Sequence, residues 1–141
     1  MFYNKYRSSW IFCFLALTVT LFVAFSGKVL AQTGATEPAA VVTMTNDLRF
    51  VPDTVRVKEG QAVLWKNSSM IVHSVTGDPG MATLKGSARL PQGAKPFNSG
   101  LLDPGGEFRH TFSVPGTYQY FCIPHEGVKM YGWVIVEEGA D

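Results

Sequence analysis

The sequence has few cysteines, no concentrated charge and no very long apolar segment, and each shortage excludes a class of protein. Its 141 residues include only two cysteines, Cys13 and Cys122, and Cys13 falls inside an apolar run near the amino end. No internal disulfide is expected outside that run, although exported domains commonly use paired cysteines. Lys and Arg number 12 against 11 Asp and Glu, without a basic cluster, so nucleic acid is not an expected partner.

The longest apolar run indicates export. Trp10 to Phe25 is sixteen residues long, fewer than the roughly 20 that a membrane-spanning helix usually needs. Two basic residues precede the run, and Val29-Leu30-Ala31 follows it with the small residues of a signal-peptidase site. We predict that residues 1–31 are a cleaved signal peptide and that the protein is exported, to a periplasm or a thylakoid lumen. The alternative is an uncleaved segment that tethers the protein to the membrane.

The rest of the chain has the length and composition of one globular domain. We predict a flexible segment over 32–39, made of small and polar residues, and a single domain over 40–141. A hydrophobic fraction of 46% is too high for a disordered chain. Short runs rich in Val, Thr, Phe and Tyr are separated by Gly, Pro, Asn and Asp, which is typical of an all-β sandwich or barrel.

Seven or eight strands are expected, without a helix of ordinary length. Thr54 to Lys58 alternates valine with basic residues, as a half-buried strand does, and Trp65 is a predicted core residue. The long connection over 77–95 leaves room for a short helix, and 123–131 is predicted to be a loop. The main predicted strands are Ala40–Thr45, Thr54–Lys58, Ala62–Lys66, Ile71–Thr76, Glu107–Val114, Thr117–Cys122 and Trp133–Glu137.

Three potential metal ligands lie close together near the carboxyl end. Cys122, His125 and Met130 have the spacing C-x2-H-x4-M, with the cysteine at a strand end and the other two in the following loop. His73, on a predicted strand far upstream, is the natural second imidazole. Thiolate and thioether ligands favour copper, whereas methionine is unusual for zinc. Two histidines, one thiolate and a weak axial methionine form the copper site of electron-transfer proteins.

Each of these residues alone would more often be structural. A single buried cysteine or methionine usually serves packing, and a single strand histidine usually has an ordinary hydrogen-bonding role. Their combined spacing is what predicts one copper ion bound by His73, Cys122, His125 and Met130. His110 lies on a strand away from the motif, and we do not expect it to bind metal.

The chain resembles the plastocyanin-like cupredoxins, which are type 1 (blue) copper proteins. The stretch Gly116 to Gly132, with Tyr-x-Tyr-Phe-Cys-x-Pro-His-x4-Met-x-Gly, resembles the copper loop of plastocyanin and is similar in spacing to that of pseudoazurin. Upstream, Phe50, Trp65 and Asn67 precede His73 as in the first half of that family. The resemblance covers about Val41 to Glu137. It implies a Greek-key β-sandwich with one copper and Cu(I)/Cu(II) cycling as its activity.

Two departures limit what the resemblance implies. Plastocyanin usually has tyrosine just before the cysteine and asparagine after the first histidine, and this chain has Phe121 and Ser74 there. A surface tyrosine route for electrons is therefore not expected, and the link between the His73 and Cys122 segments should differ. No dense acidic patch like that of plant plastocyanins is present, so the physiological partner does not follow from the resemblance.

The favoured function is that of a monomeric electron carrier that is not an enzyme. Its partners would be redox proteins such as a cytochrome, in a photosynthetic or respiratory chain. Oxidase or nitrite-reductase chemistry would need a second copper or an open coordination position, and no residues supply either. The alternative is a copper store or chaperone without electron transfer, although a buried site on a rigid sandwich suits electron transfer better.

Overall fold

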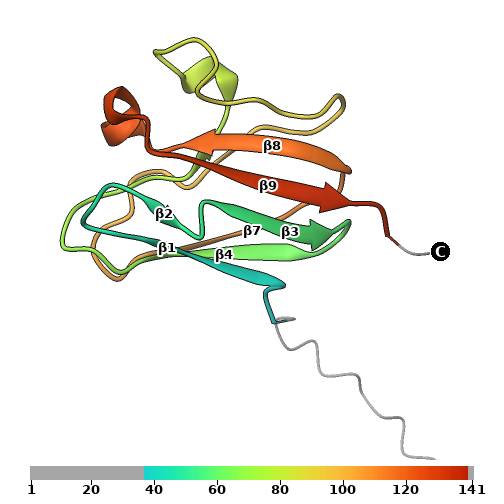
Figure 1. Ribbon diagram of the computed structural model, residues 1–141, viewed down its shortest axis with the longest axis horizontal. Coiled ribbons are helices and arrows are strands. Elements are labelled where there is room, and N and C mark those ends of the chain that lie inside the picture. The colour runs from blue at the N-terminus through green and yellow to red at the C-terminus, as the bar shows by residue number, and fades with distance from the viewer. Residues whose placement is uncertain (1–36, 140–141) are drawn as a thin grey trace, which may run out of the picture. The chain divides into compact units, whose positions relative to one another are not determined.

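A computed structural model describes residues 37–139, and within them nine strands form two mixed sheets that pack face to face (Figure 1). The strand order is β2-β1-β4-β7 in one sheet and β3-β9-β8-β5-β6 in the other. This arrangement confirms the predicted all-β sandwich. The strands are β1 (Ala40–Met44), β2 (Phe50–Val51), β3 (Thr54–Lys58), β4 (Ala62–Asn67), β5 (Thr76–Gly77), β6 (Phe97–Asn98), β7 (Glu107–Thr111), β8 (Gly116–Phe121) and β9 (Tyr131–Glu137).

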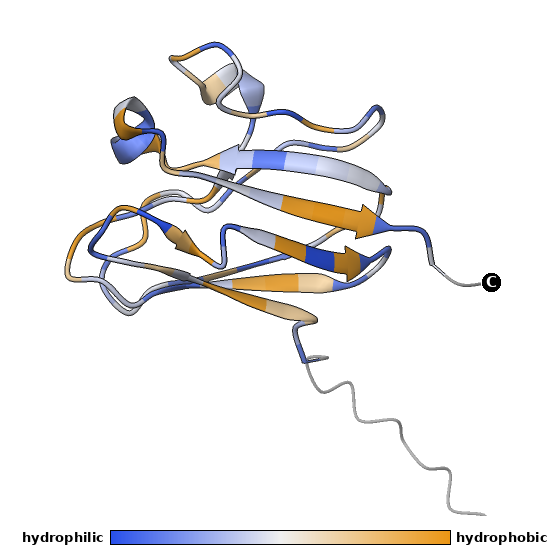
Figure 2. Ribbon diagram, viewed as in Figure 1, coloured by the Kyte–Doolittle hydropathy of each residue, from blue (hydrophilic) through white to orange (hydrophobic). Residues whose placement is uncertain are grey.

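The alternation seen in the sequence sets which side of each strand faces the core. Val55 and Val57 of β3 are buried while Arg56 and Lys58 are exposed, as predicted. Hydrophobic residues lie along β1, β4 and β9, whereas the connections alternate between hydrophilic and hydrophobic stretches (Figure 2). Side chains from both sheets therefore meet in one apolar layer.

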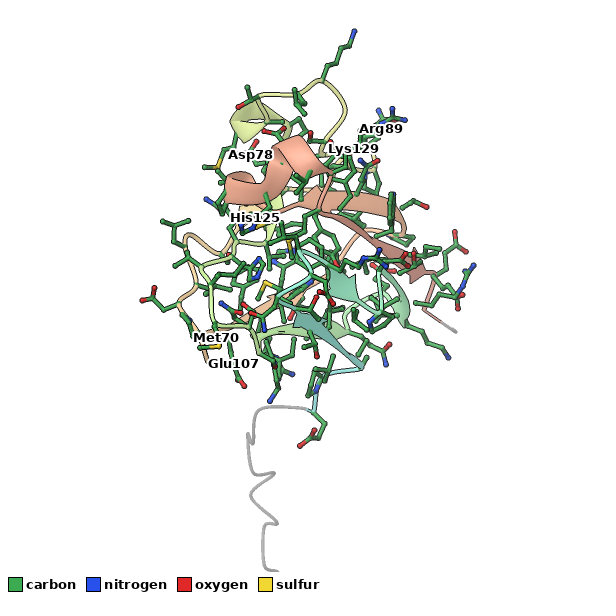
Figure 3. The ribbon with its side chains drawn as sticks, turned by 60° about the vertical axis from the view of Figure 1, so that its left-hand side comes forward. Met70, Asp78, Arg89, Glu107, His125 and Lys129 are labelled. Atoms are coloured by element: carbon green, nitrogen blue, oxygen red, sulfur yellow. The ribbon has the colours of Figure 1, made fainter. Side chains whose placement is uncertain are left out.

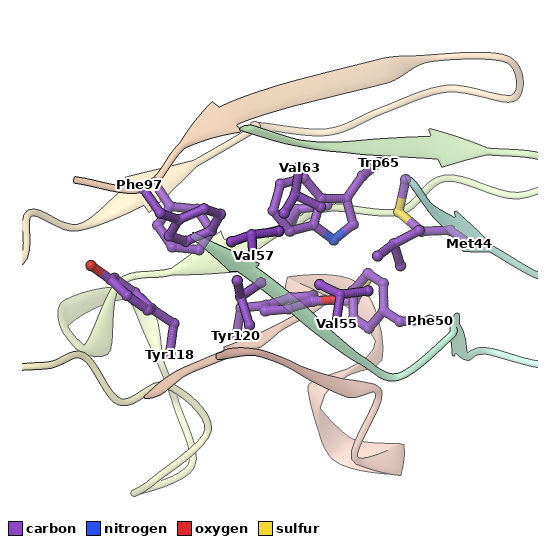
Figure 4. Packing of buried hydrophobic residues seen from close by; sticks show 14 of the residues in the cluster. Met44, Phe50, Val55, Val57, Val63, Trp65, Phe97, Tyr118 and Tyr120 are labelled. Atoms are coloured by element: carbon purple, nitrogen blue, oxygen red, sulfur yellow. The ribbon is translucent and has the colours of Figure 1, made fainter. Parts of the chain in front are cut away.

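Aromatic rings fill the centre of that layer. Trp65, the predicted core residue, is fully buried and packs edge-on against Tyr120, with ring centroids 5.4 Å apart (Figure 4). Phe50 of β2, in the same sheet as Trp65, contacts the same tyrosine ring, with ring centroids 4.8 Å apart. A Cβ atom on Gly132 would lie 2.3 Å from the Tyr120 ring, so only glycine fits at that position of β9. The aromatic core thus explains why the ligand motif of this chain ends in glycine.

Strand pairing brings two distant segments to one end of the sandwich. β8 and β9 are antiparallel, so the connection between them, which contains the short 3-10 helix η2 (Ile123–Val128), lies beyond the end of both strands. β5 pairs with β8 through Thr76 and Phe121, which places the segment before Thr76 beside Cys122. The two halves of the ligand set therefore meet although about fifty residues separate them.

Three local predictions differ from the structure. Ile71–Thr76 is not a continuous strand: His73 forms an isolated bridge with Leu102, and β5 begins only at Thr76. Several strands are only two residues long, which raises their number above the predicted seven or eight. The 77–95 connection contains the short helix η1 (Pro79–Met81), for which the sequence left room, whereas η2 was predicted as a loop.

The amino-terminal prediction concerns residues that the structure does not describe. The predicted signal peptide, 1–31, lies wholly outside the described residues, as does most of the predicted flexible segment over 32–39. In the described part of the chain, no helix has the length and apolar character needed to cross a membrane.

Candidate metal centre

Cys122 is the first residue after β8, and its position is fixed by backbone bonds to the loop that follows. Its N–H donates to the Met130 carbonyl at 3.1 Å, and its carbonyl accepts from the N–H of His125 at 3.1 Å. The N–H of Met130 donates in turn to the His125 carbonyl at 3.3 Å. The three predicted ligands of this loop are thus joined by their own main-chain hydrogen bonds.

The side chains of His73, Cys122 and His125 converge on one point. One ligand atom from each lies within 4.8 Å of the others. Sγ of Cys122 is 3.6 Å from Nδ1 of His73 and 3.3 Å from Nδ1 of His125. Ligands bound at about 2.0–2.3 Å around one ion are separated by about 3.6 Å in trigonal geometry, so these three atoms fit a common metal ion.

Burial differs among the four predicted ligands. His73 and Cys122 are fully buried and Met130 is 2% exposed, whereas His125 is only partly buried. The imidazole rings of His73 and His125 lie 4.9 Å apart at 58°. His125 lies at the end of the sandwich that Figure 3 turns toward the viewer. It is therefore the ligand through which the centre reaches the protein surface.

His73 is held by its backbone rather than by a continuous strand. Its N–H donates to the Leu102 carbonyl at 3.1 Å, and its own carbonyl accepts from the N–H of Leu102 at 2.7 Å. Burial lowers the pKa of His73, the charge of His125 lowers it further, and the Thr45 backbone acts in the opposite direction. A lowered pKa favours the neutral imidazole, which is the form that binds metal.

Ser74 links the two halves of the site. Its N–H donates to Sγ of Cys122 at 3.2 Å, and its hydroxyl accepts from the N–H of Ile123 at 2.8 Å. Burial raises the pKa of the Cys122 thiol, and hydrogen bonds from Ser74 and His125 oppose this increase. A bound metal ion would supply the remaining stabilisation that the thiolate needs.

Glu126 is a second residue whose role was not predicted from the sequence. Its side chain is 6% exposed and accepts hydrogen bonds from the N–H groups of Thr83 and Leu84. Burial raises its pKa, but hydrogen bonds from Ser87, Leu84 and Thr83 outweigh burial and leave the pKa lowered. The only sequence signal was its position, directly after a ligand.

The other candidate residues lie elsewhere. His110 stacks on Phe97 with ring centroids 4.4 Å apart and packs edge-on against Phe112, within the aromatic layer. Burial lowers the pKa of His110. Met70 is 84% exposed and Met81 is 43% exposed, in contrast to the buried Met130.

A two-sheet β-sandwich that gathers a thiol and two imidazoles at one end has the architecture of a cupredoxin. Residues 38–137 match the family described as copper-binding proteins of the plastocyanin/azurin family, and the chain belongs to this family. It is therefore a copper-binding protein, and the cluster described above is its candidate copper site.

Known relatives agree with this assignment. The chloroplastic plastocyanin of Tetradesmus obliquus is 31% identical over 115 residues, which cover 82% of this chain and 77% of the relative. The plastocyanin of Scenedesmus fuscus is 32% identical over 94 residues, or 64% of this chain and 88% of the relative. Among solved structures, a pseudoazurin from Sinorhizobium has a TM-score of 0.54 at 28% identity and covers 72% of this chain and 75% of its own. An oxidised amicyanin mutant has a TM-score of 0.56 at 26% identity and covers 74% of this chain and 88% of its own.

Proposed function

We propose that this protein is a type 1 copper electron carrier whose single copper is bound by His73, Cys122, His125 and Met130. The observation that carries the proposal is the convergence of one thiol and two imidazole nitrogens within 4.8 Å at the end of the sandwich. When bound, copper supplies a one-electron Cu(I)/Cu(II) couple. The protein acts as a carrier between redox proteins, such as a cytochrome and its oxidant, and not as an enzyme.

The chain's own residues would keep the site similar in both oxidation states. Cys122 and His73 are anchored by strand and bridge hydrogen bonds, and Ser74 joins their segments. A site held this firmly changes little when an electron arrives or leaves. The same burial argues against a copper store or chaperone, because copper exchange needs accessible ligands.

Exposed apolar residues support a docking role for the end of the molecule near His125. Val128 is 64% exposed in the loop of His125, Leu101 is 68% exposed next to the bridge partner of His73, and Met70 is 84% exposed nearby in sequence. An apolar surface of this kind suits the small, short-lived interfaces of electron-transfer partners. An electron would enter and leave through the half-buried His125 ring.

A copper titration of the purified protein tests this function. We expect one Cu(II) per chain, an intense visible absorption band from the thiolate bond, and a reversible reduction potential. Cys122→Ser should abolish the band while leaving the β-sheet circular dichroism intact, because the core does not depend on the thiol. Retention of the band in this variant would exclude Cys122 as a ligand. Copper binding without a reversible couple would favour a storage protein.

Export is the second part of the proposal, and it is supported by the sequence of residues 1–31. The mature protein would then begin at Gln32, act as a monomer, and work in a periplasm or a thylakoid lumen. Intact-mass measurement on protein from the exporting host decides this point. A mass that retains residues 1–31 would instead indicate a membrane tether.

A further inference from the structure

Glu126 is a buried carboxylate inside the ligand loop, and its hydrogen-bond partners in the described part of the chain are uncharged groups. Within residues 37–139, Arg56 pairs with Glu137 and Lys66 pairs with Glu107, and neither pair includes Glu126. Only 6% of its surface is exposed. Burying a charge without a partner is costly unless hydrogen bonds replace the lost water. The surrounding fold must therefore provide hydrogen-bond donors to this carboxylate.

Two backbone N–H groups supply these hydrogen bonds together with the Ser87 side chain. Oε2 of Glu126 accepts from the N–H of Thr83 at 3.1 Å, and Oε1 accepts from the N–H of Leu84 at 2.9 Å. Both oxygens act as acceptors, which is the pattern of an ionised carboxylate. Thr83 and Leu84 follow η1 in the long connection between β5 and β6. One side chain thus fastens the ligand loop to a segment about forty residues away in the sequence.

The backbone of Glu126 also belongs to the turn that separates the two loop ligands. Its carbonyl accepts from the N–H of Lys129 at 2.9 Å, and Lys129 adopts a left-handed conformation with φ of 60° just before Met130. His125 immediately precedes Glu126 in η2. Any movement of Glu126 would therefore be transmitted to His125 on one side and to Met130 on the other.

We propose that Glu126 is a positioning residue that fixes the His125 loop against the 79–84 segment and whose negative charge lowers the reduction potential of the copper site. The proposal rests on the function proposed above. A negative charge in a poorly solvated position stabilises Cu(II) more than Cu(I), because the oxidised site carries one more positive charge. Charged hydrogen bonds to the loop residues around a ligand likewise tune a metal site.

The charge is tested with Glu126→Gln, which keeps the shape of the side chain but removes its charge. Glu59→Gln is the matched control, because Glu59 is an exposed carboxylate in the turn between β3 and β4. We expect the reduction potential of the copper-loaded protein to rise in Glu126→Gln and to rise clearly less in Glu59→Gln. Equal shifts in the two variants, or a fall in Glu126→Gln, would overturn the role of the charge.

The attachment of Glu126 to the amides of Thr83 and Leu84 is tested by hydrogen exchange, which needs no copper. In the unmodified metal-free protein the amides of Thr83 and Leu84 should be protected, and Glu126→Gln should speed their exchange roughly ten-fold or more, because a charged acceptor is lost. If these amides are unprotected in the unmodified protein, the proposed attachment of the ligand loop to the 79–84 segment is wrong, and no variant is needed to show it.

Glu126→Asp separates the effect of the charge on the reduction potential from the attachment of the loop. It also replaces the glutamine variant as the test if that variant does not fold. It keeps the charge but is too short to reach both amides, so exchange should accelerate while the potential stays near that of the unmodified protein. Unchanged exchange, or a potential as high as in a neutral variant, would overturn the proposal. If the unmodified protein itself lacks a reversible blue copper couple, the proposed function fails rather than this inference.

Discussion

At the scale of single residues, Ser74 shows how a small side chain replaces a larger one at a critical contact. Plastocyanin usually has asparagine at this position, so the serine of this chain predicted a different link between the two ligand segments. The structure forms the link with the Ser74 N–H on the Cys122 sulfur and the hydroxyl on the N–H of Ile123. The contact to sulfur uses the backbone, so it does not depend on the residue type. The side chain instead fixes the start of η2.

We predict that Ser74→Ala lowers stability but keeps the blue absorption band. The variant leaves the partly buried N–H of Ile123 without its acceptor, at a cost of about 1 kcal/mol. For a domain of this size the midpoint of thermal unfolding should fall by roughly 5 °C or more. The backbone bond to Cys122 remains, so the thiolate band should be preserved.

The matched control for this variant is Ser113→Ala, which removes an exposed hydroxyl near the β7–β8 turn. Thermal unfolding followed by circular dichroism compares the two proteins. Equal midpoints for Ser74→Ala and Ser113→Ala would contradict the structural role assigned to Ser74.

At the scale of elements, the strands with clear alternation were predictable, and the segment that presents His73 was not. β1, β3, β4, β8 and β9 appear within one or two residues of their predicted bounds, whereas β7 ends three residues before the predicted Val114. Alternation is clearest in β3, where buried valines recur at every second position. The run from Ile71 to Thr76 is equally rich in β-formers, yet its hydrogen bonds go largely to side chains. Competition from such side chains is not visible in an alternation pattern.

Asn67 makes several of the side-chain hydrogen bonds at and around the start of this run. Its Nδ2 donates to the carbonyls of Ile71 and Leu102, at 2.8 and 2.9 Å. Its Oδ1 accepts from both the N–H and the hydroxyl of Ser69, at 3.0 and 2.6 Å. The ligand types and their spacing could be predicted from the sequence. The turn that positions His73 could not, because it depends on where the Asn67 side chain lies in three dimensions.

We predict that Asn67→Ala destabilises the metal-free protein by about 2–4 kcal/mol and weakens copper binding. The variant removes four hydrogen bonds, two of them buried and two partly buried, which tie together the segments on both sides of the His73–Leu102 bridge. Urea unfolding gives the stability, and competition with a copper chelator gives the affinity. Ser68→Ala, an exposed neighbour, is the control. A variant that loses stability but binds copper as tightly as the unmodified protein would show that Asn67 does not position His73.

At the scale of the whole molecule, His110 of β7 belongs to the aromatic layer between the two sheets and not to the metal centre. This histidine stacks on Phe97 and contacts Phe112, so the solvent cannot fully hydrate a charged ring there. Burial consequently lowers its pKa below the ordinary value of 6.5. The folded protein binds a proton at His110 less readily than the unfolded chain does.

This difference predicts a loss of stability in acid. Stability is fully present above the unfolded pKa near 6.5 and falls as pH drops toward the lower folded pKa, because protons then favour the unfolded chain. We expect the copper-loaded protein to lose stability between about pH 7.5 and pH 5, and His110→Phe to lose less over the same range. Denaturant unfolding at several pH values compares the two proteins. Parallel pH profiles would show that His110 does not contribute.

The arrangement of the whole molecule also separates the apolar surface near His125 from the acidic carboxyl end. β9 begins directly after Met130 and ends at Glu137, so the loop with Val128 and the exposed Glu137 lie at opposite ends of this strand (Figure 1). Two copies of the protein can exchange an electron with each other, and that reaction reports on contacts at the apolar surface without any knowledge of the natural partner.

We predict that Val128→Lys slows electron self-exchange about ten-fold or more, because two like charges must then be desolvated and brought together. Val41→Lys is the matched control, since Val41 is 43% exposed on β1 and away from the ligand loop. NMR line broadening in mixtures of the reduced and oxidised protein measures the rate. Slowing by Val41→Lys that equals the effect of Val128→Lys would mean that net charge, and not docking near His125, controls electron transfer.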